Sequence, residues 1–422
     1  MKGLAQSVTT AIPAPTQGWV RRQRPRFNVK RAILVLYVAL LGGVSIHLYQ
    51  KPIYSMDLIQ YMGNALLMEE RDPVRIHQRV YAEVLRSVPP IEREYLLGHV
   101  EGQTKDYAES RRERATNPYR FAQFLPLFAI RPLYNQTLWL LSKTGMGLVR
   151  SGIVISVVSY FSFGILLFIW LGNYISPELS LAISFLLMVS PPLMALGRET
   201  TSDALSTLVA FAALYFLFEK HRLMTGMALL LASIYFRTDF VVLAGPVILA
   251  CWLQKRLDLW KAAVLSLIAV ASVLCINYFA GDYGIKMLYY RNFVGVPIAP
   301  GEMTVQFSFR DYVAAFRSGI TLAANSFFIP FLLLGTVGMI SKQMRVLFGV
   351  TVAYVVLHFA VLPNWQERWV GVFYLCMGVC AATTVGSAER IVNSDQAALA
   401  STATVAEVGS TRSFIRKKGS SK

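Results

Sequence analysis

Blocks of about 15 to 22 apolar residues recur through most of the chain and are separated by short charged connectors. An α-helix of that length matches the hydrocarbon core of a bilayer, which is about 30 Å thick. Hydrophobic residues make up 55% of the sequence, and the mean hydropathy is +0.47. We therefore predict an all-α polytopic membrane protein with about ten transmembrane helices.

The predicted spans fall into one isolated helix and a later bundle. The first span covers residues 32–49, and about nine further helices fill residues 148–386. The later spans are placed at residues 151–171, 179–196, 204–218, 223–235, 241–253, 262–279, 320–340, 346–362 and 369–385. An alternative joins residues 223–254 into one helix, but about 32 residues at 1.5 Å each would far exceed the core and would leave Arg237 and Asp239 in mid-membrane. A hairpin of two short helices avoids both problems.

Basic residues give the predicted orientation. The formal net charge is +17, and Lys and Arg occupy both chain ends and the connectors on one side of the predicted bundle. Positive charge favours the cytoplasmic side, so residues 1–31 and 387–422, which lack an apolar period, are interpreted as disordered cytoplasmic tails. The distribution of this charge along the connectors argues against nucleic acid as a partner.

A polar stretch at residues 50–147 separates the first span from the others and is predicted to form a large extracytoplasmic loop. Apolar residues recur at helical spacing over residues 58–66 and again over 76–85, which predicts amphipathic helices lying along the membrane surface. Residues 121–141 are apolar but interrupted by prolines, so a surface-embedded or re-entrant helix is expected there.

Each short connector on the predicted outer side pairs an arginine with a carboxylate. The outer polar segments are Asp57 and residues 197–203, 236–239, 281–318 and 364–368. A carboxylate can accept a proton from a hydroxyl group, and a guanidinium group binds phosphate oxygens through a planar fork of donors. If these groups meet at the mouth of the bundle, their chemistry suits transfer of a group from a lipid phosphate.

Two short motifs, together with the topology, resemble the GT-C membrane glycosyltransferases. They are Tyr-Ser-Met-Asp-Leu-Ile-Gln-Tyr, which contains Asp57 just outside the first helix, and Arg-Glu-Thr-Thr-Ser-Asp-Ala-Leu at residues 198–205, which opens a later span. The chain is most similar to the bacterial branch with protein mannosyltransferases and aminoarabinose transferases. The resemblance implies inverting transfer of a sugar from a polyprenyl-phosphate donor to a glycan, lipid or protein acceptor, outside the cytoplasm at a bacterial inner membrane.

The resemblance also assigns the candidate site residues. The first-loop catalytic aspartate of the family corresponds to Asp57, and its Arg-to-Asp signature corresponds to Arg198 and Asp203. Members often carry an acidic pair in this loop, whereas Leu58 follows Asp57 here, so both the base and a requirement for a divalent cation stay open. The catalytic candidates are Asp57, Glu199 and Asp203, and the substrate-binding candidates are Arg198, Arg237, Arg368, Tyr61, Glu367 and Asp239.

Other readings of these residues are structural. Asp57 could cap the helix that begins at Leu58, and Asp203 could complement a helix dipole. The arginines could pair with neighbouring acids at the membrane interface. For the whole chain, the main alternative is a transporter or flippase of a lipid-linked or anionic solute, which would need charges near the membrane midplane and paired broken helices. A non-catalytic assembly protein with the same fold is a third alternative.

Three further polar features receive weaker functional interpretations. The arginines within residues 103–120 alternate with glutamates, which is typical of a solvated face. Residues 289–291, Tyr-Tyr-Arg, either line an acceptor groove or belong to an interfacial aromatic belt. His358 is interpreted as packed or solvated rather than functional, because no other residue stands at a ligand-like spacing from it.

Overall fold

The computed structural model describes residues 26–99, 105–281, 308–340 and 342–386, together with residues 283, 287, 289–291, 295 and 297–302. In this part of the chain the regular elements are all helices. In chain order they are α1 Arg26–Gln50, α2 Met56–Leu66, α3 Pro73–Ser87, α4 Pro90–Leu97, α5 Lys105–Thr116, α6 Pro118–Phe124, α7 Pro126–Ala129, α8 Pro132–Leu141, η1 Ser142–Met146, α9 Leu148–Leu171, α10 Pro177–Met188, α11 Pro191–Arg198, α12 Asp203–Leu214, η2 Tyr215–Glu219, α13 Leu223–Phe236, η3 Thr238–Phe240, α14 Val241–Leu253, α15 Leu259–Phe279, α17 Phe309–Ala324, α18 Phe328–Val337, η4 Gly338–Ile340 and α19 Lys342–Val361. A last helix, Glu367–Gly386, follows them.

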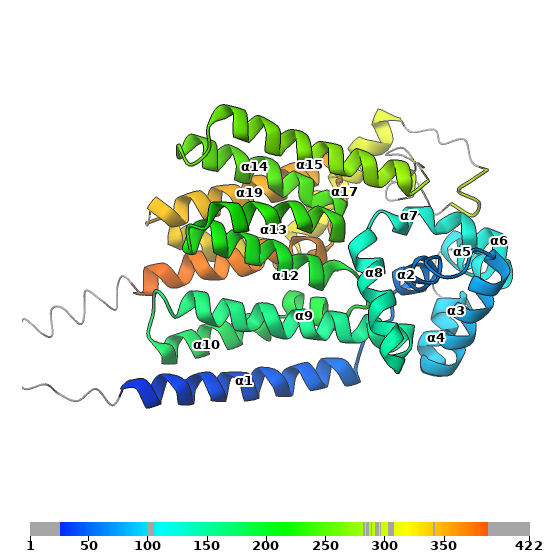
Figure 1. Ribbon diagram of the computed structural model, residues 1–422, viewed down its shortest axis with the longest axis horizontal. Coiled ribbons are helices and arrows are strands. Elements are labelled where there is room, and N and C mark those ends of the chain that lie inside the picture. The colour runs from blue at the N-terminus through cyan, green and yellow to red at the C-terminus, as the bar shows by residue number, and fades with distance from the viewer. Residues whose placement is uncertain are drawn as a thin grey trace, which may run out of the picture.

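The helices form two groups, a long bundle and a cluster at one end of it. In Figure 1, α1, α9, α10, α12, α13, α14, α15 and α19 run alongside one another, and α2 to α8 gather beyond one end of that bundle. Helix α1 begins, and the helix Glu367–Gly386 ends, at the opposite end. The polar loop expected from the sequence is thus a compact helical cluster that covers one end of the bundle.

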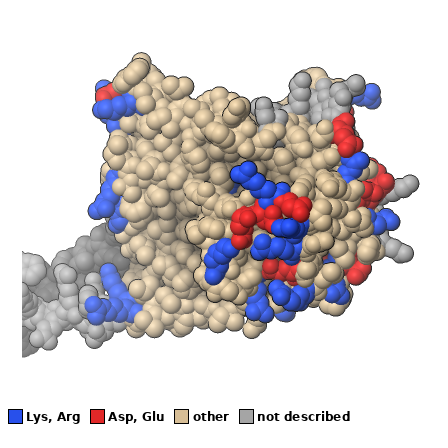
Figure 2. Space-filling model, turned by 45° about the vertical axis from the view of Figure 1, so that its right-hand side comes forward, with Lys and Arg blue, Asp and Glu red and all other residues tan. Residues whose placement is uncertain are grey.

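Five described helices are long and apolar enough to cross a membrane, and the number rises to seven if two bent pairs each count as one span. The five are Val29–Gln50 within α1, Leu148–Leu171, Leu259–Phe279, Met344–Val361 and Glu367–Gly386. Figure 2 shows charged side chains at the two ends of the molecule and a broad uncharged band between them. These features support a membrane protein. The predicted spans at 204–218, 223–235 and 241–253 contain shorter helices, so the ten-span topology stays a prediction.

Two predicted spans are not straight helices. Residues 179–196 are divided between α10 and α11, which meet at 67° before Pro191. Proline lacks an amide hydrogen and disfavours a helical residue before it, so the bend has a local cause. Residues 320–340 are divided between α17 and α18, which meet at 64°. At this second break the Ser326 hydroxyl accepts a hydrogen bond from the Phe328 amide at 3.1 Å. The predicted break near Arg237 is present, because α13 ends at Phe236 and α14 begins at Val241.

The cluster at the end of the bundle differs from the predicted surface helices in one respect. Helix α3 is amphipathic as expected, with Ile76, Val80 and Val84 buried. Helix α2 is buried on every side from Leu58 to Leu66, so neighbouring helices cover it and it exposes no face as an amphipathic surface helix would. Gly63 permits this burial, because a Cβ atom there would lie 2.7 Å from Phe121 Cζ on α6. Prolines divide the following apolar stretch into α6, α7 and α8.

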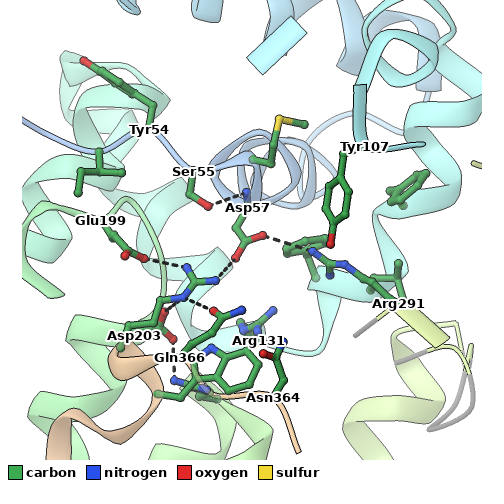
Figure 3. A pocket seen from close by; sticks show the side chains of 18 of the residues that line it. Tyr54, Ser55, Asp57, Tyr107, Arg131, Glu199, Asp203, Arg291, Asn364 and Gln366 are labelled. Carbon is green, nitrogen blue, oxygen red and sulfur yellow. Dashed lines mark hydrogen bonds and ion pairs between the residues drawn. The ribbon is translucent and has the colours of Figure 1, made fainter. Parts of the chain in front are cut away.

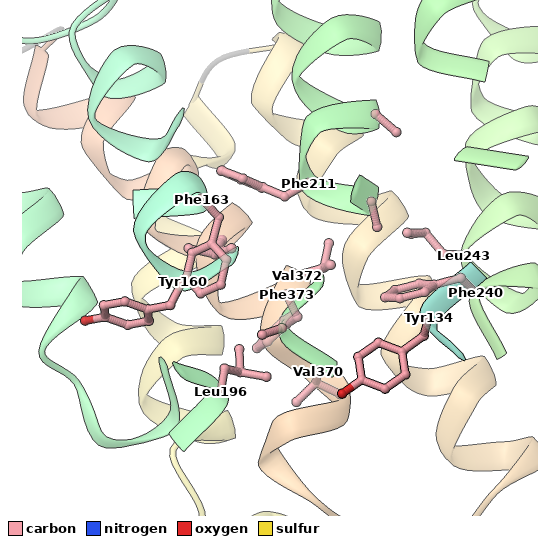
Figure 4. Packing of buried hydrophobic residues seen from close by; sticks show 14 of the residues in the cluster. Tyr134, Tyr160, Phe163, Leu196, Phe211, Phe240, Leu243, Val370, Val372 and Phe373 are labelled. Atoms are coloured by element: carbon pink, nitrogen blue, oxygen red, sulfur yellow. The ribbon is translucent and has the colours of Figure 1, made fainter. Parts of the chain in front are cut away.

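Large apolar side chains fill the interior of the bundle, as Figure 4 shows. Tyr160 and Phe163 of α9 and Phe211 of α12 are fully buried. The Tyr160 hydroxyl donates to the Met188 carbonyl oxygen at 2.7 Å, so its polar end is satisfied inside an apolar region. This packing fixes α9, α10 and α12 relative to one another, and α12 carries part of the site described next.

Candidate functional site

A cavity of about 850 Å³ lies where the α2–α8 cluster meets the end of the bundle. Figure 2 shows acidic and basic side chains crowded around a hollow on this part of the surface. The cavity is lined by Arg291 and by residues within 52–57, 91–95, 107–114, 124–131, 198–203, 237–239 and 362–369. Segments that are far apart in the sequence therefore meet at one place, as the sequence predicted for the outer connectors.

The backbone before α2 places Asp57 at this cavity. Ile53 pairs with the connector after α11: its amide donates to the Arg198 carbonyl oxygen at 2.8 Å, and its carbonyl oxygen accepts from the Thr200 amide at 3.2 Å. Ser55 then caps α2, because its hydroxyl oxygen accepts from the Asp57 amide at 3.2 Å. Asp57 is not the cap, so its carboxylate is free to point into the cavity in the first turn of the helix (Figure 3).

The Asp57 carboxylate lies between two guanidinium groups. Its Oδ2 atom is 3.5 Å from Arg368 Nη2, and its Oδ1 atom is 3.4 Å from Arg291 Nη2. Its side chain is only 15% exposed. Burial alone would raise the pKa of Asp57, but the charges of Arg368, Arg291 and Arg131 outweigh this effect and hold the pKa below its ordinary value. The group is therefore an anion over the whole physiological pH range.

Arg368 connects the predicted acidic residues. Its Nη1 atom is 2.9 Å from Glu199 Oε2, and its Nε atom is 3.5 Å from Asp203 Oδ2. The Nε group also donates to the side-chain oxygen of Gln366 at 2.8 Å. Burial raises the pKa of Glu199, and the charge of Arg368 offsets only part of that rise. Glu199 and Asp57 thus lie around one cation with their pKa values shifted in opposite directions, a pattern found where acid and base roles are separated.

A second, deeper ion pair lies beside the first. Arg237 is almost fully buried, with Nη1 2.7 Å from Asp203 Oδ1 and Nη2 2.8 Å from Asp239 Oδ2. His358 Nε2 lies 2.8 Å from Asp239 Oδ2. His358 is packed rather than solvated, the two readings that the sequence left open, and it packs against a carboxylate of the site. The guanidinium group of Arg237 is therefore neutralised by carboxylates on both sides.

Two of the predicted site residues do not line the cavity. Tyr61 is buried in α2, and its hydroxyl lies 3.3 Å from Ser202 Oγ, so it supports the connector after α11. Glu367 Oε1 accepts from the Phe327 amide at 2.8 Å, at the start of α18. Arg198 does line the cavity, but its Nε group donates to the Lys51 carbonyl oxygen at 2.9 Å.

Sequence reasoning missed three arginines that line the cavity, Arg111 and Arg114 on α5 and Arg131 before α8. Arg291, which the sequence assigned either to an acceptor groove or to an aromatic belt, also lines the cavity. The prediction of a solvated face was wrong for Arg111 and Arg114, which are 7% and 5% exposed, although Arg112 between them is exposed. The available signal was their spacing, because residues i and i+3 share one helix face.

The carboxylates of the site do not form a metal-binding cluster. Among the described residues, no group of three or more His, Cys, Asp or Glu side chains could hold a metal ion. Asp57, Glu199 and Asp203 converge on the guanidinium group of Arg368, so their oxygens already face a cation of the protein itself. These carboxylates are therefore paired with an arginine in the structure.

No protein-family model, curated protein or solved structure matches this chain. A functional assignment therefore depends on the cavity and its residues, together with the two short motifs that contain Asp57 and Asp203.

Proposed function

We propose that this protein is a membrane glycosyltransferase that moves a sugar from a polyprenyl-phosphate carrier to an extracytoplasmic acceptor, with inversion. One observation carries the proposal: a largely buried carboxylate, that of Asp57, lies between the guanidinium groups of Arg368 and Arg291 in a cavity at one end of a membrane bundle. The volume, about 850 Å³, is within the range of small-molecule sites.

In the proposed reaction an acceptor hydroxyl attacks the anomeric carbon of the donor sugar. The new bond from carbon to the acceptor oxygen forms as the bond from carbon to the phosphate oxygen breaks. The hydroxyl proton moves to the Asp57 carboxylate, and the electron pair of the broken bond leaves with the carrier phosphate. Attack opposite to the leaving group inverts the anomeric centre. The arginines of the cavity stabilise the negative charge that develops on the phosphate.

Glu199 and Asp203 act through Arg368 in this proposal. By pairing with two of its nitrogens they fix the guanidinium group beside Asp57. They are positioning residues, and Asp57 is the catalytic residue. The proposed topology has ten spans, cytoplasmic chain ends and the cavity on the outer face of a bacterial inner membrane. The acceptor would be a glycan, a lipid or a protein.

A transporter or flippase is the second candidate, and the bent helices favour it. Two pairs, α10 with α11 and α17 with α18, break at 67° and 64°, and paired broken helices are typical of transporters. The charged cavity, however, lies against the α2–α8 cluster at the end of the bundle rather than half-way along it. The two functions differ in a measurable way, because a transporter moves its solute between compartments without forming a glycosidic bond.

The decisive experiment measures sugar transfer by the purified chain in liposomes that contain a radiolabelled polyprenyl-phosphate sugar and membrane extract as the source of acceptor. We expect wild-type protein to release the carrier phosphate, and Asp57→Asn to lose at least about a hundredfold in rate, since a general base contributes about 10²- to 10⁴-fold. Asp258→Asn, an equal charge change at an exposed site on α15's amino end, is the matched control and should transfer normally. Wild-type rates with Asp57→Asn would remove the proposed mechanism.

A further inference from the structure

The arginines that line the cavity fall into two sets. Arg237 and Arg368 are balanced by carboxylates that lie 2.7 to 3.5 Å from their nitrogens. The second set, which we call the cationic wall, consists of Arg111, Arg114, Arg131 and Arg291. Within the described part of the chain, the only carboxylate paired with this wall is Asp57, which is 3.4 Å from Arg291. Glu92 also lines the cavity, but it forms no ion pair with these arginines in that part of the chain. Four positive charges therefore face two negative charges.

Arg114 is the most buried member of the cationic wall. The residue is only 5% exposed, and its Nε group donates a hydrogen bond to the Ser110 carbonyl oxygen at 2.9 Å. Its guanidinium carbon lies 4.3 Å from the centre of the Phe124 ring. No ion pair joins Arg114 to a carboxylate among the described residues. A buried guanidinium group without a counterion is costly, so its place in the cavity points to an anionic ligand.

The neighbouring arginines are also short of partners. Arg111 donates to the carbonyl and hydroxyl oxygens of Tyr95, both at 3.0 Å, but its buried Nε group has no partner in the structure as described. The buried Nε group of Arg131 likewise lacks one. Burial lowers the pKa of Arg114 to about 10, and the charges of Arg291 and Arg111 add to that effect. An anion in the cavity between these guanidinium groups would offset their mutual repulsion.

We infer that the cationic wall binds a phosphate monoester in its dianionic form, and prefers it to a singly charged phosphodiester. On the proposed function, on which this step rests, the donor is a diester with one negative charge. The released carrier is a monoester, which carries a second charge above its second pKa of about 6. The preferred ligand is then the product carrier, and the wall stabilises charge that appears only as the sugar leaves.

Asp57 strengthens this preference during the reaction. Before transfer, its negative charge opposes the phosphate and partly neutralises Arg291. When the acceptor proton moves to Asp57, that negative charge disappears while a second charge appears on the phosphate. The attraction between wall and phosphate is therefore greatest after bond cleavage. On this inference the phosphate lies beside the cationic wall, whereas the sequence assigned phosphate binding to Arg198, Arg237 and Arg368.

Binding measurements on the full chain in detergent test the inference without any sugar transfer. The probes are farnesyl phosphate, its methyl diester and inorganic phosphate, each titrated by calorimetry at pH 7.5 and pH 5.0. We expect farnesyl phosphate to bind at least about tenfold more tightly than the diester at pH 7.5, and this ratio to approach one at pH 5.0, where the monoester is mostly singly charged. Equal affinities at pH 7.5 would overturn the inference. Inorganic phosphate that binds as tightly as farnesyl phosphate would assign the site to free phosphate and overturn its assignment to the lipid carrier.

Variants of the wall provide the second arm. Arg114→Gln and Arg131→Gln should each weaken farnesyl phosphate about tenfold or more and the diester less, whereas Arg112→Gln, exposed on the same helix, should bind like wild type. Arg114→Lys retains the charge and should keep most of the preference, which covers the case in which Arg114→Gln does not fold. Unchanged binding by a folded Arg114→Gln contradicts the inference. Monoester binding without sugar transfer would count against the proposed function alone, and transfer without the monoester preference would count against this inference alone.

Discussion

Arg368 Nη2 lies 3.5 Å from Asp57 Oδ2, although the two residues are 311 positions apart in the sequence. The same guanidinium group contacts Glu199 and Asp203. The start of the first polar loop, the connector after α11 and the start of the last described helix are thus held together by one side chain. Arg368 consequently has two roles that mutation can separate, one in stability and one in the chemistry of Asp57.

Replacing Arg368 by glutamine should destabilise the fold. Three carboxylates would lose their common cation, and removing one partner of a largely buried ion pair costs about 3 to 5 kcal/mol. Thermal unfolding in detergent, followed by tryptophan fluorescence, would measure the change against Arg310→Gln, an exposed arginine on α17. The double variant Arg368→Gln with Glu199→Gln should recover part of the loss, because one unpaired charge is removed. Equal melting temperatures for Arg368→Gln and wild type would contradict the ion-pair arrangement.

The opposite pKa shifts of Glu199 and Asp57 predict opposite effects of pH. Burial raises the pKa of Glu199, so the folded protein binds a proton at this residue more tightly than the unfolded chain does. The resulting stabilisation is fully present below about pH 4.5 and is lost as the pH rises through the raised pKa. Burial would also raise the pKa of Asp57, but the charges of the arginines outweigh burial and lower this pKa. The stability that ionised Asp57 provides is therefore present above about pH 3.8 and is lost as the pH falls through the lowered pKa. Glu199→Gln should therefore gain stability over wild type as the pH rises.

Unfolding measured from about pH 4 to pH 8 checks this directly. The melting-temperature difference between Glu199→Gln and wild type should grow with pH, whereas the difference between Asp57→Asn and wild type should stay constant above about pH 4. If the melting-temperature difference between Glu199→Gln and wild type instead shrinks as the pH rises, the charge of Arg368 and not burial determines the direction of the pKa shift of Glu199.

Much of the carboxylate side of the site was predictable because it follows from topology. Asp57 comes just after an apolar block of membrane length, and Glu199 and Asp203 share one short connector, so sorting connectors by side was enough to group them. Ser55 decided the remaining question about Asp57: it accepts the capping hydrogen bond that the sequence allowed for the aspartate itself.

The arginine side was not predictable, because burial of a charged helix depends on tertiary contacts. The sequence of α5 alternates arginine with glutamate, which in isolation describes a solvated helix. The structure packs one face of it, since Ser110 donates to the carbonyl oxygen of Pro297 and Arg111 stacks on Tyr95. The burial of α2 was missed for the same reason: α2 packs against α3, α7 and α8, and no local pattern gives the positions of these helices.

Close packing near the last helix gives a prediction about the fold itself. A Cβ atom on Gly338 would lie 2.2 Å from the Cys380 carbonyl oxygen, and backbone cannot move aside as a side chain can. Gly338→Ala should therefore cost about 1 to 3 kcal/mol through overpacking. Gly349→Ala on α19 is the control: it has nothing within 4 Å of the new methyl group, and alanine favours a helix over glycine by about 1 kcal/mol. A stable Gly338→Ala would mean that the two helices are farther apart.

The predicted orientation in the membrane can be read from the labelling of single cysteines. Thr144 lies in η1 beside the α2–α8 cluster, and Lys261 lies near the start of α15 at the other end of the bundle; both are exposed. The connector before α15 carries two basic residues, and Lys261 follows in the first turn of α15, which favours the cytoplasm. In a Cys275→Ser background, which removes the exposed cysteine among the described residues, an impermeant maleimide should label Thr144→Cys in intact cells and Lys261→Cys only after permeabilisation. The reverse pattern would place the cavity in the cytoplasm, where an extracytoplasmic acceptor could not reach Asp57.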